Sequence, residues 1–273
     1  MNVGPVAASR STHLPSVTVV IPSRWGSTRF PGKPLHMLAG KPLIEHVWER
    51  CCLARNITRV LIATDDSRIF NAARRFGAEV VMTSPDHPSG TDRIAEVSLK
   101  LRNITHFINV QGDEPLIDPK LIETLANTLR RNPKIAMITA ATPFESLLEA
   151  NNPNSVKVIL NKHGDALYFS RARIPFHRDD FESESNVTPL LHLGIYGYRR
   201  EILKRLVKLA PSPLERCEKL EQLRALEHGI PIRVVKTPHR GIGVDTPEDA
   251  ARVEKLLKPY QTRIERGADP LKG

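Results

Sequence analysis

The sequence VTVVIPSRWGSTRFPGKP, residues 17–34, joins a strand pattern to a loop of basic, glycine and proline residues. Residues 17–21 are mostly β-branched, which predicts a buried strand. In the loop that follows, Arg24, Arg29 and Lys33 supply positive charge. Because a loop between the first strand and first helix of an α/β fold commonly binds phosphate groups, we expect an anion site here. A solvated basic loop is the alternative.

This loop differs from a Walker A loop in its spacing. Five residues separate Gly26 from Gly32, and Pro34 stands where that motif needs a magnesium-binding Ser or Thr. A long loop with two glycines can still surround a polyphosphate with backbone N–H groups. Residues 1–44 contain no Asp or Glu, which also favours an anion site.

Working outward, short β-branched runs alternate with helix-period segments, which predicts an α/β fold with a mostly parallel sheet. We expect strands at 60–63, 79–82, 106–111 and 135–140, with helices at 42–56, 67–76, after Gly90, and at 118–129. After these come a hairpin turning at 161–164, a strand at 191–198, helices at about 199–209 and 214–228, a strand at 232–237 and a capped helix from Thr246. Residues 178–189 are expected to form a mobile loop.

Composition limits the class of protein. The chain has 273 residues, of which 40% are hydrophobic and 26% charged, as in ordinary globular proteins. Its apolar runs are too short to cross a bilayer. Three cysteines, two of them adjacent, are too few for a disulfide framework and favour a reducing, cytoplasmic location. Residues 1–16 show no periodicity and lack the apolar block of a signal peptide, so we expect a loose leader.

The net charge of +10 alone fits nucleic acid, a membrane surface or a polyanionic small molecule. Aromatic residues make up only 5% of the chain, and no basic run is interleaved with them, which argues against a protein that stacks on single-stranded nucleic acid. We therefore expect no nucleic-acid and no membrane partner.

Two aspartates follow predicted strands or precede a predicted helix. Asp113 comes after the apolar run 106–111, and Asp245 stands immediately before Thr246, with Asp249 in the capping-box position. One alternative is that Asp245 only aids the start of the helix. If both carboxylates meet opposite the basic loop, they suit magnesium–nucleotide chemistry.

Several blocks occur in an order typical of one enzyme family. They are PSRWGSTRFPGKPL, ATDD, HPSGTDRIAEV, NVQGDEPLI, NPNSVKVIL, ALYFSRARIP, HLGIYGYR, SPLERCEKLEQLR and GVDTPED. The chain resembles the 3-deoxy-manno-octulosonate (Kdo) cytidylyltransferase family over roughly residues 17–257. The resemblance implies a three-layer α/β nucleotidyltransferase with a mostly parallel, mixed sheet and a smaller β-rich portion for sugar binding and dimerisation. Residues 17–140 would mainly bind CTP, residues 150–240 would mainly bind the sugar and dimerise, and 258–273 would be a tail.

The implied reaction joins CTP and Kdo into CMP-Kdo and pyrophosphate, with Mg²⁺, in a homodimer that activates Kdo for lipopolysaccharide. Lys33, Asp113 and Asp245 would be catalytic, and the two aspartates would bind the metal. The residues implied to contact the nucleotide are Arg24, Arg29, Lys33, Ser89, Gly90, Thr91, Arg93 and Gln111. Those implied to contact the sugar acid are Arg171, His192, Tyr196, Glu221 and Gln222.

From the residues alone, the sugar set is less certain. His192 and Tyr196 share one face of a strand, where a buried core pair would look the same. Glu221 would also suit an ordinary helix surface. The family often has Ala, Tyr and Leu where this chain has Ser23, Trp25 and Phe30, and Glu where it has Asp92. These differences remove no charged or metal-binding group, but they leave fine nucleotide selectivity open. A sialic-acid nucleotidyltransferase is the nearest competing enzyme.

Overall fold

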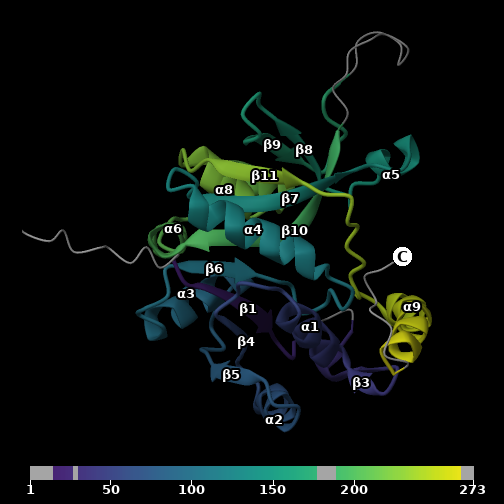
Figure 1. The fold of residues 1–273 in the computed structure, drawn as a ribbon. Coiled ribbons are helices and arrows are strands. Elements are labelled where there is room, and N and C mark those ends of the chain that lie inside the picture. The colour runs from purple at the N-terminus through teal and green to yellow at the C-terminus, as the bar shows by residue number, and fades with distance from the viewer. Residues whose placement is uncertain (1–14, 27–29, 177–188, 266–273) are drawn as a thin grey trace, which may run out of the picture.

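A nine-stranded mixed sheet runs through the protein, as the computed structural model shows in Figure 1. The structure describes residues 15–26, 30–176 and 189–265. Seven strands follow the order β11-β7-β10-β6-β1-β4-β5, while β8 pairs with β10 and β9. The strands are β1 Val17–Ser23, β4 Arg59–Thr64, β5 Glu79–Met82, β6 His106–Asn109, β7 Met137–Pro143, β8 Lys157–Leu160, β9 Ala166–Ser170, β10 Leu190–Arg199 and β11 Ile232–Lys236.

Strand β1 lies at the centre of the parallel part of the sheet. It pairs in parallel with β4 on one side and with β6 on the other. Its residues alternate between the two faces: Val19 and Ile21 belong to one core cluster and Val20 to the other. Since the chain extends the sheet in one direction from β1 and then in the other, the carboxyl end of β1 borders a crevice suited to a ligand.

Helices cover both faces, which confirms the predicted three-layer α/β class. Helices α1 (Leu43–Cys52), α2 (Ser67–Arg75) and α4 (Pro119–Arg131) pack on the face of Val19. Helices α3 (Gly90–Lys100), α6 (Arg200–Leu206) and α8 (Gln222–Glu227) pack on the face of Val20. The short helix α5 (Leu147–Asn151) lies outside these layers, and α7 (Pro213–Glu218) has no buried residue. No helix in the described part of the chain is both long and apolar enough to traverse a bilayer.

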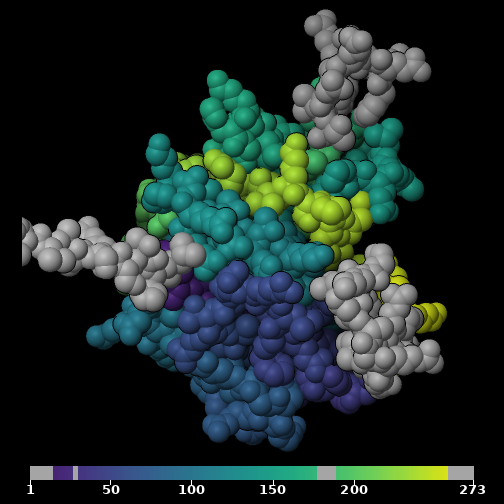
Figure 2. All heavy atoms as spheres, viewed as in Figure 1, coloured from purple at the N-terminus to yellow at the C-terminus, as the bar shows by residue number. Residues whose placement is uncertain are grey.

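Strand β10 makes the sheet mixed. It runs antiparallel to β6, β7 and β8. At its centre, a Cβ on Gly197 would lie 2.6 Å from Ile138 and 2.9 Å from Ile108, so only glycine fits beneath α4. The predicted hairpin is present, because β8 and β9 pair antiparallel around Asn161–Gly164. In Figure 2 the early residues gather in one half of the molecule and the later strands in the other.

The structure corrects one expected helix. The expected helix at 214–228 is two helices, because Lys219 is left-handed (φ 54°) and Leu220 is buried in the core between α7 and α8. Helix α9, the capped helix expected from Thr246, runs Pro247–Glu265. Strands β2 (Met37–Leu38) and β3 (Lys41–Pro42) and the 3₁₀ helix η1 (Lys33–Leu35) were not predicted. The expected loop at 178–189 lies almost wholly outside the described residues.

A third core cluster joins the segment around the start of α9 to β2 and α1. Val244, Ala250 and Val253 pack against Leu38 and Leu43, next to β2 and α1. This packing brings the start of α9 to the carboxyl end of β1, although the two are more than two hundred residues apart in sequence. Asp245 therefore lies beside the basic loop.

Candidate active site

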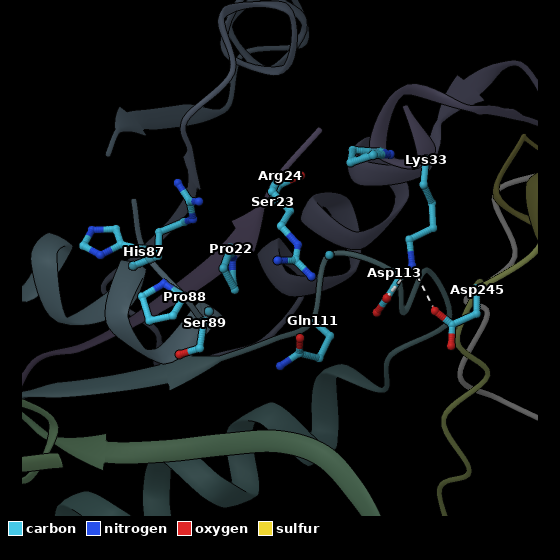
Figure 3. Close-up of a pocket in the computed structure, with 14 residues that line it drawn as sticks. Pro22, Ser23, Arg24, Lys33, His87, Pro88, Ser89, Gln111, Asp113 and Asp245 are labelled. Carbon is cyan, nitrogen blue, oxygen red and sulfur yellow. Dashed lines mark hydrogen bonds and ion pairs between the residues drawn. The ribbon is translucent and has the colours of Figure 1, made fainter. Parts of the chain in front are cut away.

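Lys33 lies between the two predicted aspartates. Its Nζ donates to Asp113 Oδ2 at 2.7 Å and to Asp245 Oδ1 at 3.2 Å. Figure 3 shows the lysine pointing at both carboxylates. Its side chain is only 12% exposed, whereas those of Asp113 and Asp245 are 32% and 48% exposed. The predicted convergence of the three residues is confirmed.

Backbone contacts hold both aspartates in place. The N–H of Val244 donates to the Asp113 carbonyl at 2.9 Å, which ties the two segments together. Thr246 accepts from the Asp249 N–H, and the Asp249 carboxylate accepts from the N–H of Thr246 and of Asp245. Thr246 therefore caps α9 with Asp249. The carboxylate of Asp245 is turned to Lys33 instead, so the alternative that Asp245 only starts the helix is wrong.

The donor set suits a hard dication. Two carboxylate oxygens already converge on one positive charge, the Lys33 ammonium, and carboxylates are the ligands that Mg²⁺ prefers. No group of three or more His, Cys, Asp and Glu side chains gathers as a metal site within the described residues. A metal held here would therefore need further ligands from substrate oxygens.

A cavity of about 420 Å³ opens beside this triad. Ser23 and Arg24 border it from the end of β1, and Gln111 to Asp113 from the loop after β6. Ser89, the N-cap of α3, and Gly90 border it from another side. Because the N-terminus of a helix carries a partial positive charge, this first cavity is suited to phosphate. Arg29 lies outside the described residues.

Arg93 also borders the first cavity, but its guanidinium is already paired. It bonds Asp65 at 2.9 Å and also Thr83, and the residue is 3% exposed. It anchors α3 to the loop after β4. Direct contact between Arg93 and a nucleotide stays a prediction.

A second cavity of about 240 Å³ adjoins the first and shares Gly90 and Gln111 with it. Four of the five predicted sugar residues line it, namely His192, Tyr196, Glu221 and Gln222. Thr91, from the predicted nucleotide set, lines it too. Gln111 donates to the Gly194 carbonyl at 3.2 Å, which fixes its side chain between the two cavities. Among the described residues lining the second cavity there is no Lys or Arg.

His192 is a neutral hydrogen-bonding group. Burial lowers its pKa to about 3. Its Nε2 lies 3.0 Å from the Thr139 hydroxyl, which is also 2.7 Å from the carbonyl of Ile195. Because a carbonyl can only accept, the hydroxyl donates to Ile195 and accepts from Nε2–H. Nδ1 is then an acceptor, and a substrate hydroxyl is a fitting donor to it.

Glu221 lies where the two cavities meet. Burial raises the pKa of this carboxyl, and hydrogen bonding with Thr91 opposes the rise. Its Oε1 is 3.4 Å from the hydroxyl of Ser89, which bonds Asp92 at 2.6 Å. The carboxyl of the second cavity is therefore in contact with the helix cap of the first. This excludes the surface role that Glu221 could have had.

Arg171 lies elsewhere. Its guanidinium donates to the main-chain carbonyls of Glu218 at 2.7 Å, Pro153 at 3.1 Å and Lys219 at 3.5 Å. It is absent from the described lining of both cavities. In the structure it holds the segment that leads to Glu221. Its contact with a sugar acid stays a prediction.

Three polar residues in or near the site were not predicted. Burial, followed by the charge of Asp113, raises the pKa of Glu114 to about 8. Asn109 and Tyr198 line the second cavity, and Tyr198 hydrogen-bonds Thr91 and Asn109. The only sequence signal for Asn109 was a polar residue ending an apolar strand.

Comparisons with known proteins agree with this geometry. A model of the cytidylyltransferase family matches residues 18–235. The 3-deoxy-manno-octulosonate cytidylyltransferase of Syntrophotalea carbinolica is 50% identical over 248 residues, which cover 89% of this chain and 99% of that relative. The protein of the same name from Myxococcus xanthus is 52% identical over 239 residues, covering 88% and 95%.

A solved structure of CMP:2-keto-3-deoxy-manno-octonic acid synthetase complexed with CTP superposes with a TM-score of 0.85. It is 42% identical and covers 90% of this chain and 99% of its own. Sequence and structure thus agree over nearly the whole described chain. The chain belongs to the cytidylyltransferase family, in the group of the 3-deoxy-manno-octulosonate cytidylyltransferases.

Proposed function

We propose that this protein transfers the cytidylyl group of CTP to Kdo, giving CMP-Kdo and pyrophosphate. The observation that carries the proposal is Lys33 held between Asp113 and Asp245, beside two adjoining cavities of different chemistry. The first is bordered by cations and a helix N-terminus, as a triphosphate needs. The second has no Lys or Arg in its described lining and is rich in hydrogen-bonding groups, as a polyhydroxylated sugar needs.

In this reaction the anomeric oxygen of Kdo forms a bond to the α-phosphorus as the bond to the pyrophosphate oxygen breaks. The proton of the hydroxyl is released to water, and the leaving pyrophosphate takes the electron pair of the broken bond. The protein contributes mainly position and positive charge. Lys33 and Arg24 neutralise the phosphates, and the N–H groups at the start of α3 bind phosphate oxygens.

Mg²⁺ is the proposed cofactor, with Asp113 and Asp245 as its protein ligands. When bound there, a dication would stabilise the negative charge that develops during the transfer. Lys33 would then turn from the two carboxylates to the phosphates. The partial exposure of Asp113 and Asp245 leaves room for that exchange.

The polarity of the two cavities also orients the sugar acid. The carboxylate of Kdo is attached to its anomeric carbon, so carboxylate and attacking oxygen lie at the same end of the molecule. Because the described lining of the second cavity holds no Lys or Arg, that end should face the first cavity, near Arg24 and Lys33. The sugar hydroxyls would then meet His192, Tyr196 and Gln222.

We also propose that the protein is a cytoplasmic homodimer. Leu167 on β9 and Phe176 are 57% and 89% exposed, so they offer apolar surface for a homodimer. All three cysteines are unpaired thiols, which fits the reducing cytoplasm. The product, CMP-Kdo, would serve lipopolysaccharide biosynthesis.

The test is pyrophosphate release with CTP, Mg²⁺ and a panel of sugar acids. We expect turnover with Kdo, much slower turnover with sialic acid and none with neutral hexoses, because a sugar without the carboxylate loses its charge-assisted contact with Arg24 and Lys33. Sialic acid used at a rate comparable to Kdo would replace this proposal with the competing enzyme. A matched Asp245→Asn protein controls for contaminating activity.

A further inference from the structure

The residue beside Arg24 faces away from the first cavity and makes a separate set of contacts. Trp25 packs against the core cluster of the β1 face, and it does not belong to the described lining of either cavity. The guanidinium carbon of Arg68, on α2, lies 3.4 Å from the centre of the Trp25 ring. This is a close cation–π stack between the basic loop and a helix behind it.

Asp66 fixes Arg68 in that stack. The carboxylate of Asp66 accepts from Arg68 Nε at 3.0 Å and from Nη2 at 2.6 Å, while it caps α2 by accepting from the Arg68 N–H at 2.8 Å. A bidentate pair of this kind sets the plane of the guanidinium. The stack is thus attached to the start of a well-formed helix.

The ring of Trp25 also lies against the backbone of Gly32. A Cβ on Gly32 would lie 3.0 Å from both Cη2 and Cζ2 of the ring, and Gly32 is left-handed with φ 70°. Its N–H also donates to the Trp25 carbonyl at 3.4 Å. Gly32 is the N-cap of η1, whose first residue is Lys33. The ring therefore touches the residue from which Lys33 extends into the site.

From this arrangement we propose that Arg68 and Trp25 are positioning residues that hold the Gly32 end of the basic loop and so place Lys33 for the phosphates of CTP. Neither residue touches the reacting atoms. They act by keeping Gly32 and Lys33 in one conformation before the nucleotide binds, which lowers the ordering cost of binding. The inference rests on the proposed use of CTP.

The experiment compares Arg68→Ala with Arg75→Ala. Both remove one exposed arginine from α2, but only Arg68 stacks on Trp25. We expect Arg68→Ala to raise the KM for CTP about fivefold, with the KM for Kdo and kcat within twofold, because an exposed cation–π contact is weak. Arg75→Ala should match the parent, and Arg68→Lys should restore part of the loss.

A second readout needs no turnover. The chain has two tryptophans, so a Trp48→Phe background leaves Trp25 as the fluorophore. Without nucleotide, Arg68→Ala should make Trp25 more accessible to acrylamide, whereas Arg75→Ala should not; if Trp48→Phe unfolds, the same difference is measured with Trp48 present. The inference is overturned if the parent protein releases pyrophosphate and Arg68→Ala changes neither the KM for CTP nor the acrylamide quenching. A parent inactive with CTP and Kdo overturns the proposed function instead.

Discussion

Replacing Lys33 with Met should expose the cation site that its ammonium occupies. The change removes a charge lying 2.7 Å and 3.2 Å from two carboxylates and leaves Asp113 and Asp245 facing each other. Breaking a buried pair costs about 3–5 kcal/mol, while an exposed pair contributes about 0–1 kcal/mol. Since the two aspartates are a third to a half exposed, we expect a loss of about 1–2 kcal/mol in metal-free buffer.

The assay is thermal unfolding with and without Mg²⁺. A loss of this size lowers the Tm by roughly 2–8 °C in a chain of this length. Millimolar Mg²⁺ should recover most of it, because the two carboxylates are then free of their lysine competitor. The parent protein should respond less to the same Mg²⁺. In turnover assays, kcat with CTP should fall by about 10²–10³-fold, as when a group that stabilises developing charge is removed.

Lys41→Met is the matched control for this comparison. Lys41 pairs with Glu49 on the surface, where the side chains are 38% and 40% exposed. Its removal should shift the Tm by less than about 4 °C and should not change the response to Mg²⁺. The reasoning is refuted if Lys33→Met responds to Mg²⁺ no more than the parent does, since Asp113 and Asp245 would then not form one cation site.

Three further predictions concern the two roles at the start of α9, the pH dependence of stability and the oligomeric state. Asp245→Asn should abolish turnover at an unchanged Tm, whereas Thr246→Ala should lower the unfolding free energy by about 1 kcal/mol through loss of the helix cap; equal effects of both on turnover would contradict the split. For Glu96, burial alone would raise the pKa, but hydrogen bonds from Lys100, the Ser84 N–H and His87 lower it to about 2. A lowered pKa stabilises the fold above about pH 5 and the effect is lost toward pH 2, so Glu96→Gln should cost about 1 kcal/mol in urea unfolding at pH 7 and nothing near pH 2. Light scattering should give the mass of a dimer at micromolar concentration, and a monomer mass would count against the homodimer.

Local patterns predicted much of the fold. The strand at 79–82 matches β5, and the Asn161–Gly164 turn matches the hairpin, because both depend on neighbouring residues. The helix expected at 214–228 is divided because Lys219 is left-handed and Leu220 is drawn into the core. Both features depend on packing between residues far apart in the sequence, which the local pattern of apolar residues does not indicate.

The site shows the same limit. Lys33, Asp113 and Asp245 were identified because each is a charged residue next to a strand or helix end, and such ends meet at one edge of a parallel sheet. Arg171 has an equally suggestive charge, yet three main-chain carbonyls satisfy its guanidinium. Asn109 has no charge and was missed, although it is 3% exposed and lines the second cavity.

The position of Arg171 changes how carboxylate recognition should be understood. Arg171 already donates to the main-chain carbonyls of Glu218 and Lys219, on the backbone that leads to Glu221. To meet the sugar carboxylate, its guanidinium would have to give up some of these bonds. A carboxylate at the first cavity instead lies near Arg24 and Lys33, beside the phosphate it must approach. The cations that bind CTP then also offset the repulsion between the sugar carboxylate and the phosphate. Arg24 and Lys33 should therefore strengthen the binding of both the sugar acid and the nucleotide.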